Sequence, residues 1–541
     1  MMLSRQGLFY LGTAAILGGV PTPGAAQDAD CAGLAQLLSN EQTQVQAVAV
    51  TDINPESVEG KTLATDLPEI CRVTGTTSPV EGSQIGFEVW LPADGWNGRL
   101  RMFGNGGYSS SMAFDRVSQA VAQGYAATVT DTGHQGDDPD FALGRPESID
   151  DWGHRAVHET IKQAKAAVAG YYGRPADYSY FDGCSTGGQQ AFAEAQRYPE
   201  DFDGIIAGAP GHNRTRLNAG FLWLYLSNHE AGLDDRQIVP NGKLPMVADA
   251  VFRQCKSQRA EGASGLASDP FLNDPLSCTP DIDALVCANG DGDDCLTRAE
   301  ADALAAMYDG PRDPVSGERI YFGWPVGSEN AGSNQEKPGW SLYWSDFGSE
   351  ERPARVSFWQ IWAFDDPEWS WWDIDLGRDI GRADDRIAAR VNAMDADLEP
   401  FRQSGGKMIH YHGLADPVVP AAESISYWRR VQQTMGSTDD FYKLYLVPGM
   451  EHCRGGTGAN SFELQSLLEA WVEDDIAPES IEAAHHAGNE PDAAVEFTRP
   501  LCAYPQKTFH DGSGPETEAA SFTCRVADEP AFEDLGQAYL R

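Results

Sequence analysis

The pentapeptide Gly183-Cys-Ser-Thr-Gly187 places one serine in the G-x-S-x-G pattern of a nucleophile elbow. Residues 177–182 before it predict a short strand, and residues 188–197 after it predict a helix. A strand, a tight turn and a helix together push a serine hydroxyl out over the edge of a sheet, where it can attack an ester. Because the chain holds 56 glycines, this pattern arises easily by chance, so other residues must support it.

Two later segments each end an apolar strand in a loop that carries a titratable residue. Residues 407–412 lead to Asp416, and residues 443–447 lead to His452. The order Ser, Asp, His is that of α/β-hydrolases. We expect His452 to be the base for Ser185, and Asp416 to fix the imidazole tautomer and stabilise the imidazolium. Taken singly, an aspartate before proline is typical of a turn and a loop histidine of a solvated side chain, so the prediction depends on all three.

Cysteines flank two members of this set. Cys184 directly precedes Ser185, and Cys453 directly follows His452. If the serine and the histidine lie within hydrogen-bond reach, the two cysteines are also neighbours, and a disulfide needs Cα atoms about 5.5 Å apart. The arrangement predicts a bridge between the elbow and the histidine loop. Two free, buried cysteines are the alternative.

The cysteine-flanked serine and histidine, with an aspartate between them in the chain, resemble the tannase/feruloyl esterase family, which includes the mono-hydroxyethyl terephthalate hydrolases. The resemblance extends over nearly the whole chain after the first residues, through segments 96–99, 104–107, 203–211 and 446–453. It implies an α/β-hydrolase core with a mostly parallel sheet and a large inserted lid. It also implies hydrolysis of aromatic-acid esters through an acyl-enzyme.

An ester hydrolase also needs preorganised N–H groups for the negative oxygen of its tetrahedral intermediate. Thr186, directly after the nucleophile, is one expected donor. The other is expected from the glycine-rich stretch 104–107, where the resemblance favours Gly107 over Gly106. A turn without a ligand is the alternative. The stretch has no lysine, which argues against a phosphate-binding loop.

The ten cysteines are typical of an oxidising compartment. Sequence alone leaves their connectivity open, but the resemblance implies five pairs: Cys31–Cys71, Cys184–Cys453, Cys255–Cys278, Cys287–Cys295 and Cys502–Cys524. Many family members bind calcium in the lid through aspartates, and the matching positions here are Lys256, Arg259 and Ala263. Calcium needs several oxygen ligands. We therefore expect neither this metal site nor a cofactor.

Strand and helix signals alternate up to the elbow, at 85–91, 100–103, 126–130 and 155–169, which predicts an α/β fold with helices on both faces of the sheet. The pattern changes after residue 210 and resumes after residue 396. We therefore expect a hydrolase core over 27–210 and 397–541 and a lid domain over 211–396. Residues 1–26 combine Arg5, a short apolar run and a small-residue cleavage site, as in a signal peptide.

The predicted lid is rich in aromatic residues, most of them expected in its own core and the rest around an apolar slot for a flat ring: Trp340, Tyr343, Trp344, Phe347, Phe358, Trp359, Trp362, Phe364, Trp369, Trp371 and Trp372. From this set Trp359 is a candidate substrate contact. Arg355 lies among them and matches the carboxylate-binding arginine of the terephthalate-type members, so it is predicted to grip a substrate carboxylate or phenol-side oxygen. An ion-paired surface arginine is the alternative.

The net charge of −42 argues against nucleic acid and anionic membranes as partners. After the signal, no segment is long and apolar enough to span a membrane. We therefore expect a periplasmic or secreted serine carboxylesterase that cleaves feruloyl, galloyl or terephthalate half-esters. An esterase or lipase for aliphatic esters is one alternative, and a non-catalytic binding module on a hydrolase scaffold is another. Nothing in the sequence indicates an oligomeric state.

Overall fold

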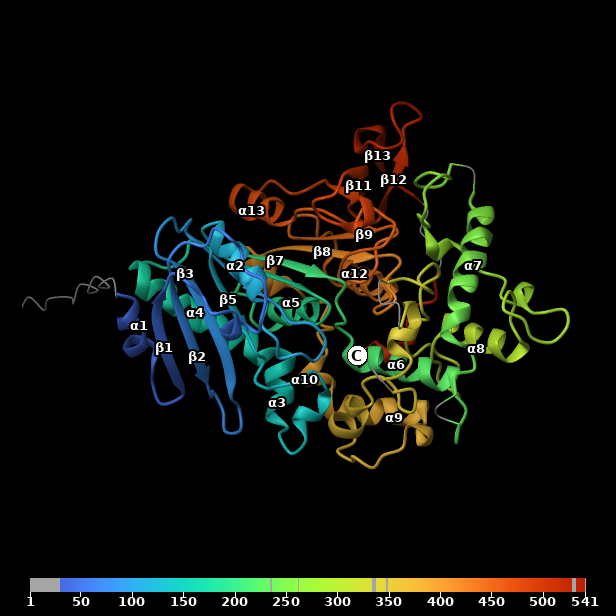
Figure 1. Cartoon of the computed structure of the whole chain (residues 1–541), viewed down its shortest axis with the longest axis horizontal. Coiled ribbons are helices and arrows are strands. Elements are labelled where there is room, and N and C mark those ends of the chain that lie inside the picture. Colours follow the sequence, from blue (N-terminus) through green and yellow to red (C-terminus); the bar gives the residue numbers. More distant parts are fainter. Residues whose placement is uncertain are drawn as a thin grey trace, which may run out of the picture.

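A nine-stranded sheet forms the centre of the molecule, in the order β1-β2-β3-β5-β4-β6-β7-β8-β9 (Figure 1). The computed structural model describes residues 30–233, 236–260, 262–332, 337–346, 349–527 and 532–540, so the predicted signal peptide lies outside the described residues. The strands are β1 Thr43–Val50, β2 Ile70–Thr77, β3 Ile85–Pro92, β4 Arg99–Phe103, β5 Ala126–Thr130, β6 Tyr178–Cys184, β7 Gly204–Gly208, β8 Lys407–Gly413 and β9 Tyr442–Val447.

The type of strand pairing changes once across this sheet, from antiparallel to parallel. β1, β2, β3 and β5 pair antiparallel. From β5 through β4, β6, β7, β8 and β9 all neighbours are parallel. This is the mostly parallel α/β-hydrolase sheet that the alternating pattern predicts, and the carboxyl ends of its parallel strands all meet at one edge.

Helices cover both faces of the sheet because its strands are apolar on both sides. Ile205 and Ile206 are adjacent on β7 and point to opposite faces. Ile205 packs in the cluster that includes α1 Cys31–Leu38, α4 Ala156–Tyr172, α5 Thr186–Arg197 and α12 Ala421–Met435. Ile206 packs in the cluster that includes α13 Gln465–Asp474, while α2 Phe114–Ala122 covers the same sheet nearer β3. The short helix α3 Glu147–Asp150 precedes α4.

The long segment between β7 and β8 is mainly helical and irregular; we call residues 211–396 the lid segment. Its helices are α6 Arg214–Asn228, α7 Leu244–Gln258, α8 Arg298–Asp309, α9 Leu376–Ala383 and α10 Ala389–Val391, and α11 Glu399–Gln403 follows it. Figure 1 draws α6 to α9 in green to yellow, beside the sheet. Most of its aromatic residues form a core, as expected, and Trp340, Trp344, Phe358, Trp359 and Trp362 are buried.

Trp362 joins the lid segment to the sheet. Its ring meets Tyr108 edge-on with centroids 5.4 Å apart, and Trp152 at 5.2 Å. Its indole Nε1 donates to the carbonyl oxygen of Pro139 over 2.7 Å. The lid segment and the loops at the strand ends therefore share one hydrophobic core.

Two small hairpins follow the main sheet, and no sequence signal above predicts them. β10 Ser480–His486 pairs with β11 Val495–Cys502, and β12 Gln506–His510 pairs with β13 Phe522–Val526. Ile481 and Leu501 of the first hairpin pack with Trp471 of α13, so this hairpin extends the core beyond β9. No helix among the described residues is long and apolar enough to cross a bilayer.

The structure contains the five disulfides that the resemblance implies: Cys31–Cys71, Cys184–Cys453, Cys255–Cys278, Cys287–Cys295 and Cys502–Cys524. They use all ten cysteines of the chain. Only Cys184–Cys453 joins residues more than two hundred positions apart, with a sequence separation of 269.

Candidate active site

Ser185 occupies a tight turn between β6 and α5. Its φ of 63° is left-handed, a conformation that costs a non-glycine residue about 1–3 kcal/mol and is held only by its surroundings. The Ser185 amide donates to Gly208 O over 3.0 Å. A Cβ on Gly183 would lie 2.5 Å from the carbonyl oxygen of Gly187, so the turn requires these glycines. This is the geometry that the G-x-S-x-G pattern predicts.

His452 and Asp416 meet at the ends of β9 and β8. His452 Nδ1 lies 2.7 Å from Asp416 Oδ2. An ionised carboxylate only accepts hydrogen bonds, so Nδ1 carries the proton and Nε2 is the basic nitrogen. Asp416 is fully buried, whereas the His452 side chain is 21% exposed. The pair therefore presents a base to solvent and holds its orienting carboxylate inside.

Asp416 is held by the backbone that follows it and by a second histidine. Its Oδ1 accepts from Val418 N at 2.7 Å and Val419 N at 3.0 Å. Burial alone would raise the pKa of Asp416, but the charge of His452 and hydrogen bonds from His412 and His452 outweigh burial and hold this pKa well below its usual range. Asp416 is thus kept ionised, as an orienter of imidazole must be.

His412 begins a buried hydrogen-bond chain that the sequence analysis does not predict. Its Nε2 lies 2.8 Å from Val419 O and 3.3 Å from Asp416 Oδ2, and its Nδ1 lies 2.7 Å from Ser424 Oγ. Ser424 Oγ is also 2.8 Å from His410 Nε2, and the other ring nitrogen of His410 is 2.9 Å from Tyr442 OH. With both imidazoles neutral, every hydroxyl and N–H in the chain can donate toward Asp416. A histidine four residues before the aspartate, at a strand end, is the signal that points to it.

The Cys184–Cys453 bridge connects the two halves of this arrangement. The Cα atoms are 6.0 Å apart, and Cys453 has a left-handed φ of 65°. Because Cys184 precedes the serine and Cys453 follows the histidine, the bridge ties the elbow to the histidine loop.

The predicted oxyanion loop lies against the first turn of α5. Thr186 is the first residue of that helix, so its N–H has no acceptor within the helix. Its hydroxyl donates to the carbonyl oxygen of Gly107 over 2.7 Å. Gly107 has a φ of 56°, and a Cβ on Gly104 would lie 2.7 Å from the Cα of Gly187. The structure thus brings Gly107 and Thr186 together beside Ser185.

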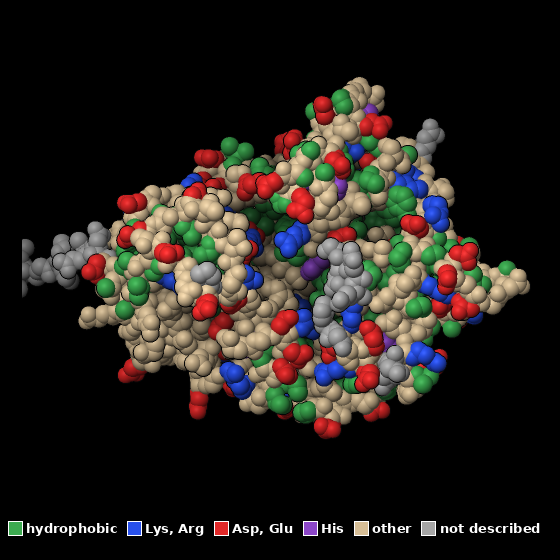
Figure 2. All heavy atoms as spheres, viewed as in Figure 1, with side chains coloured by type: hydrophobic (Ala, Val, Ile, Leu, Met, Phe, Trp, Pro, Cys, Tyr) green, Lys and Arg blue, Asp and Glu red, His purple; other side chains and the backbone are tan. Residues whose placement is uncertain are grey.

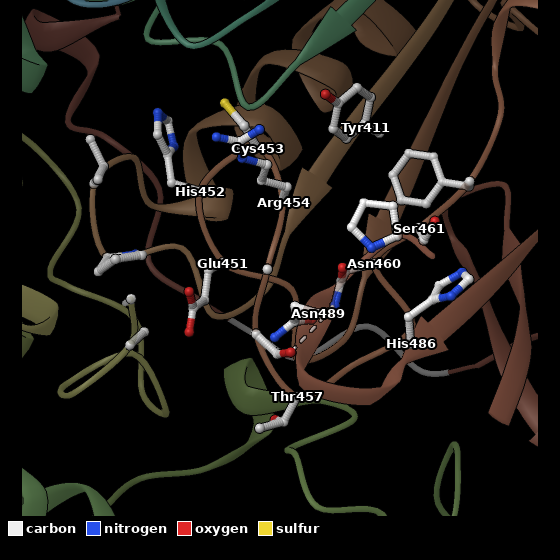
Figure 3. A pocket seen from close by; sticks show the side chains of 18 of the residues that line it. Tyr411, Glu451, His452, Cys453, Arg454, Thr457, Asn460, Ser461, His486 and Asn489 are labelled. Atoms are coloured by element: carbon white, nitrogen blue, oxygen red, sulfur yellow. Dashed lines mark hydrogen bonds between the residues drawn. The ribbon is translucent and has the colours of Figure 1, made fainter. Parts of the chain in front are cut away.

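A cleft of about 1060 Å³ opens beside His452. Figure 2 shows this face of the molecule hollowed near its middle, with basic side chains and a histidine at the hollow. In Figure 3, His452, Cys453 and Arg454 lie on one side of the cleft, and Asn460, His486 and Asn489 lie across from them. Its lining includes four basic and four acidic residues: Arg101, Arg116, Lys337 and Arg454, and Asp182, Glu451, Glu463 and Glu490. The cleft is far larger than one aromatic ring requires.

Sequence comparison matches residues 71–525 to the family described as tannase and feruloyl esterase. The chain belongs to this family. It is 34% identical to an uncharacterized esterase of Xanthomonas campestris pv. campestris, over 99% of this chain and 98% of that protein. It is 31% identical to a probable feruloyl esterase B-2 of Aspergillus terreus, over 87% of this chain and 89% of that protein.

A solved structure agrees with these relatives. Feruloyl esterase B from Aspergillus oryzae has a TM-score of 0.79 to this chain at 25% identity, covering 92% of this chain and 99% of that one. Membership in this family makes the chain a carboxylesterase hydrolase, and its substrates small-molecule esters.

The two predicted substrate contacts of this tannase and feruloyl esterase family member have different surroundings. Arg355 lies near the oxyanion loop: a Cβ on Gly107 would be 3.6 Å from its Nη2. Its guanidinium contacts Asp137, through the backbone oxygen and, at 3.3 Å, through Oδ2. Trp359 is 1% exposed, donates to Asn218 O over 3.3 Å and is not among the cleft-lining residues. Arg355 is therefore near the site but ion-paired, and Trp359 lies in the aromatic core of the lid segment.

The loop around Arg259 and Ala263, where the sequence predicts that the calcium site is missing, is organised by an arginine. Arg259 Nη2 donates to three backbone oxygens, those of Ala263 at 2.8 Å, Ser264 at 3.2 Å and Gly265 at 2.9 Å. A guanidinium supplies positive charge to carbonyl oxygens that a cation would otherwise coordinate. The expectation that this loop needs no metal thus has a physical basis in Arg259.

Among the described residues, one other group has metal-ligand spacing. His158, Glu194 and Asp201 each place a ligand atom within 4.8 Å of the others. Burial first, and then the charge of Asp201, raises the pKa of Glu194 well above its usual value. A neutral carboxyl is a poor ligand, because metals bind the deprotonated form. His158 Nδ1 is moreover 2.6 Å from Asp201 Oδ2, so these two side chains already pair with each other.

Proposed function

We propose that this carboxylesterase is an exported serine esterase that cleaves esters of aromatic acids through an acyl-enzyme. One observation carries the serine mechanism: the strained Ser185 elbow is tied by the Cys184–Cys453 bridge to a histidine that Asp416 orients. The relatives named as feruloyl esterases support hydroxycinnamic acids as the acyl part. Five disulfides support an oxidising compartment, periplasmic or extracellular.

The proposed mechanism assigns each group one task. His452 Nε2 takes the proton from Ser185 Oγ as that oxygen attacks the ester carbonyl. The negative oxygen that forms accepts hydrogen bonds from the backbone N–H groups of Gly107 and Thr186. His452 then gives its proton to the leaving alcohol, and an acyl-serine remains. Water, deprotonated by the same nitrogen, attacks the acyl-serine, and release of the acid restores Ser185.

The lid segment supports an aromatic acyl group over a long aliphatic one. Trp362 of the lid segment is buried near the oxyanion loop against Tyr108 and Phe141, with ring centroids 5.4–5.5 Å apart. Flat rings favour offset and edge-on contacts of this kind. Arg355, beside Gly107, adds a positive charge that suits a carboxylate or phenolic oxygen on the acyl part.

A substrate panel tests the proposal. Methyl ferulate, methyl gallate, mono-hydroxyethyl terephthalate and p-nitrophenyl butyrate are compared by kcat/KM, with Ser185→Ala as the matched inactive control. The proposal expects at least one aryl ester to exceed the butyrate and all activity to disappear in the control. A preference for the butyrate would contradict the proposal and indicate an aliphatic esterase instead. Absence of turnover on all four, with no covalent labelling of Ser185, would leave a binding module.

A further inference from the structure

Arg214 is a buried arginine directly behind the predicted oxyanion loop. It begins α6, at the start of the lid segment, and is 4% exposed. Its Nη2 donates to Thr186 Oγ1 over 3.0 Å. A Cβ on Gly211 would be 3.4 Å from the same Nη2, and the Gly211 amide donates to Ser185 O over 3.4 Å. The guanidinium therefore lies against the backbone that holds the nucleophile.

This arginine makes no close ion pair with the described residues, although buried Glu423 is near enough to interact with its charge. No carboxylate of the described residues lies at ion-pair distance from it, and its Nε is buried without a hydrogen-bond partner. Arg216, two residues further on, pairs with Asp384 over 2.6 Å. The Arg214 guanidinium lies over aromatic rings, 5.0 Å from Trp152 and 5.7 Å from Tyr108. A buried charge with one charged hydrogen bond to a threonine requires an explanation.

The direction of the hydrogen bonds around Thr186 explains why this arginine is buried here. A guanidinium only donates, so Thr186 Oγ1 must accept from Arg214. The threonine hydroxyl has a single proton, and that proton must then point to Gly107 O, 2.7 Å away. Arg214 therefore fixes the direction of the one hydrogen bond that joins the two residues expected to form the oxyanion hole.

Charge adds to this geometry. A positive group held behind the oxyanion donors, in a site with little water, stabilises negative charge that develops in front of them. Tyr108 directly follows Gly107 and has a second guanidinium, that of Arg355, 5.7 Å from its ring. Two cations thus flank the residue after the oxyanion glycine, in a chain whose net charge is −42.

We propose that Arg214 is a positioning residue of the oxyanion hole, acting through the Thr186 hydroxyl on Gly107. The role rests on the proposed serine mechanism and deepens it. Arg214 is buried behind Thr186, so the proposed role is to stabilise the transition state and not to bind the substrate. Its removal lowers kcat and leaves KM nearly unchanged.

Variant kinetics on p-nitrophenyl acetate test this, because that small ester makes no demand on acyl specificity. Arg214→Met is expected to lower kcat about ten- to a hundredfold, less than the ~10²–10³ for removing an oxyanion donor outright, with KM changed less than about threefold. Arg214→Lys, which keeps a donor and a charge, should recover part of the loss. Binding of phenylboronic acid, which forms a tetrahedral serine adduct, should weaken by the same factor as kcat falls.

Two controls separate positioning from a structural role. Rates are expressed per serine that reacts to completion with a fluorophosphonate, so misfolded protein does not count. Arg216→Met removes an equally buried arginine that contacts Asp384; it should lower the melting temperature and leave kcat per active serine unchanged. In a Thr186→Val background, Arg214→Met should have little further effect, whereas in Thr186→Ser its effect should persist.

Several results would overturn the role. A rise in KM at unchanged kcat would make Arg214 a substrate contact. A loss that vanishes after correction for active serines would make it a structural residue. An effect of full size in the Thr186→Val background would show that it does not act through the hydroxyl. If wild type neither turns over the ester nor binds the boronic acid, the serine mechanism fails and this role fails with it; loss of the Arg214 effect alone leaves the mechanism standing.

Discussion

The strand-end loops of the sheet and the lid segment are built in different ways. In the loops, Ser185, Asp416 and His452 each follow a parallel strand, and backbone hydrogen bonds, a buried carboxylate and one disulfide hold them. In the lid segment, helices and irregular stretches are held by packed tryptophans such as Trp344 and Trp362. The difference implies that strand topology positions the proposed catalytic groups, whereas side-chain packing in the lid segment shapes the proposed substrate site.

The largest expected effect comes from a substitution that changes the strand-end loops alone. Asp416→Asn should lower kcat by about 10⁴-fold, because the amide favours the wrong tautomer of His452. Far-UV circular dichroism should still show a folded protein, whereas fluorophosphonate labelling of Ser185 should slow together with kcat, because it needs the same base. A fall of less than about tenfold would mean that Asp416 does not orient the base.

Acid unfolding of the same variant sharpens the assignment. The folded-state pKa of Asp416 lies below its unfolded value, so its ionisation contributes stability that is present above about pH 4 and is lost as pH falls toward the folded pKa. The asparagine side chain of the variant cannot titrate. The free energy of unfolding of Asp416→Asn should therefore fall less steeply than that of wild type below about pH 4, as measured by urea titrations.

The disulfides allow a direct comparison of the two regions. Replacing Cys184 and Cys453 together by alanine opens the 269-residue separation and should reduce the free energy of unfolding by about 5–6 kcal/mol in the chain-entropy model. It should also lower kcat, since the bridge joins the elbow to the histidine loop. The matched lid pair Cys287 and Cys295, only 8 apart, should cost about 2–3 kcal/mol and leave kcat unchanged. Equal effects on kcat would contradict a special role for the first bridge.

Arg355 tests whether the lid segment reads substrate charge. Arg355→Ala should lower kcat/KM for mono-hydroxyethyl terephthalate about ten- to a hundredfold, the contribution of a charge-assisted bidentate contact, and largely spare its uncharged methyl ester. Arg454→Ala is the matched control, because Arg454 lines the cleft beside His452 and makes no ion pair with the described residues. If kcat/KM falls equally for both esters in Arg355→Ala, the ion pair with Asp137 stabilises the lid segment and Arg355 does not bind the substrate carboxylate.

The smallest expected effect concerns the loop that Arg259 organises. EDTA should leave the melting temperature of wild type unchanged, because Arg259 already satisfies three carbonyl oxygens. Arg259→Met should lower the free energy of unfolding by about 1–3 kcal/mol by leaving buried acceptors unpaired, with kcat unchanged. A drop in melting temperature with EDTA that calcium reverses would show that a metal binds elsewhere in the chain.

The sequence predicts most of what the strands position. The strand and helix around Ser185, the strands before Asp416 and His452, and the Cys184–Cys453 bridge follow from local patterns and chain order. Helix α5 begins at Thr186, two residues earlier than periodicity alone indicates. The reason is that Thr186 and Gly187 belong to the glycine-containing motif and show no helical periodicity. Each of these residues is predictable from its immediate neighbours in the sequence, and chain order then joins them into one set.

Other features depend on how separate elements pack against one another, which sequence patterns specify only in part. The hydrogen-bond chain from Asp416 through His412 to Ser424 requires a strand to face a helix. Nothing in the sequence distinguishes Arg214 from the other arginines. Only the structure shows that α6 places it behind Thr186. The ion pair of Arg355 with Asp137 likewise joins residues 218 positions apart, and the hairpins β10–β13 carry no strong signal of their own.

Covalent labelling tests the central claim most directly. The protein is incubated with a fluorophosphonate at neutral pH, digested without reduction, and the modified peptide is identified by mass spectrometry. We expect one phosphonate per chain on Ser185, in a peptide that remains linked through Cys184 to the peptide containing His452 and Cys453, and no label on Ser185→Ala. Labelling of another residue, or an unlabelled wild type that still hydrolyses esters, would contradict the assignment of Ser185 as the nucleophile.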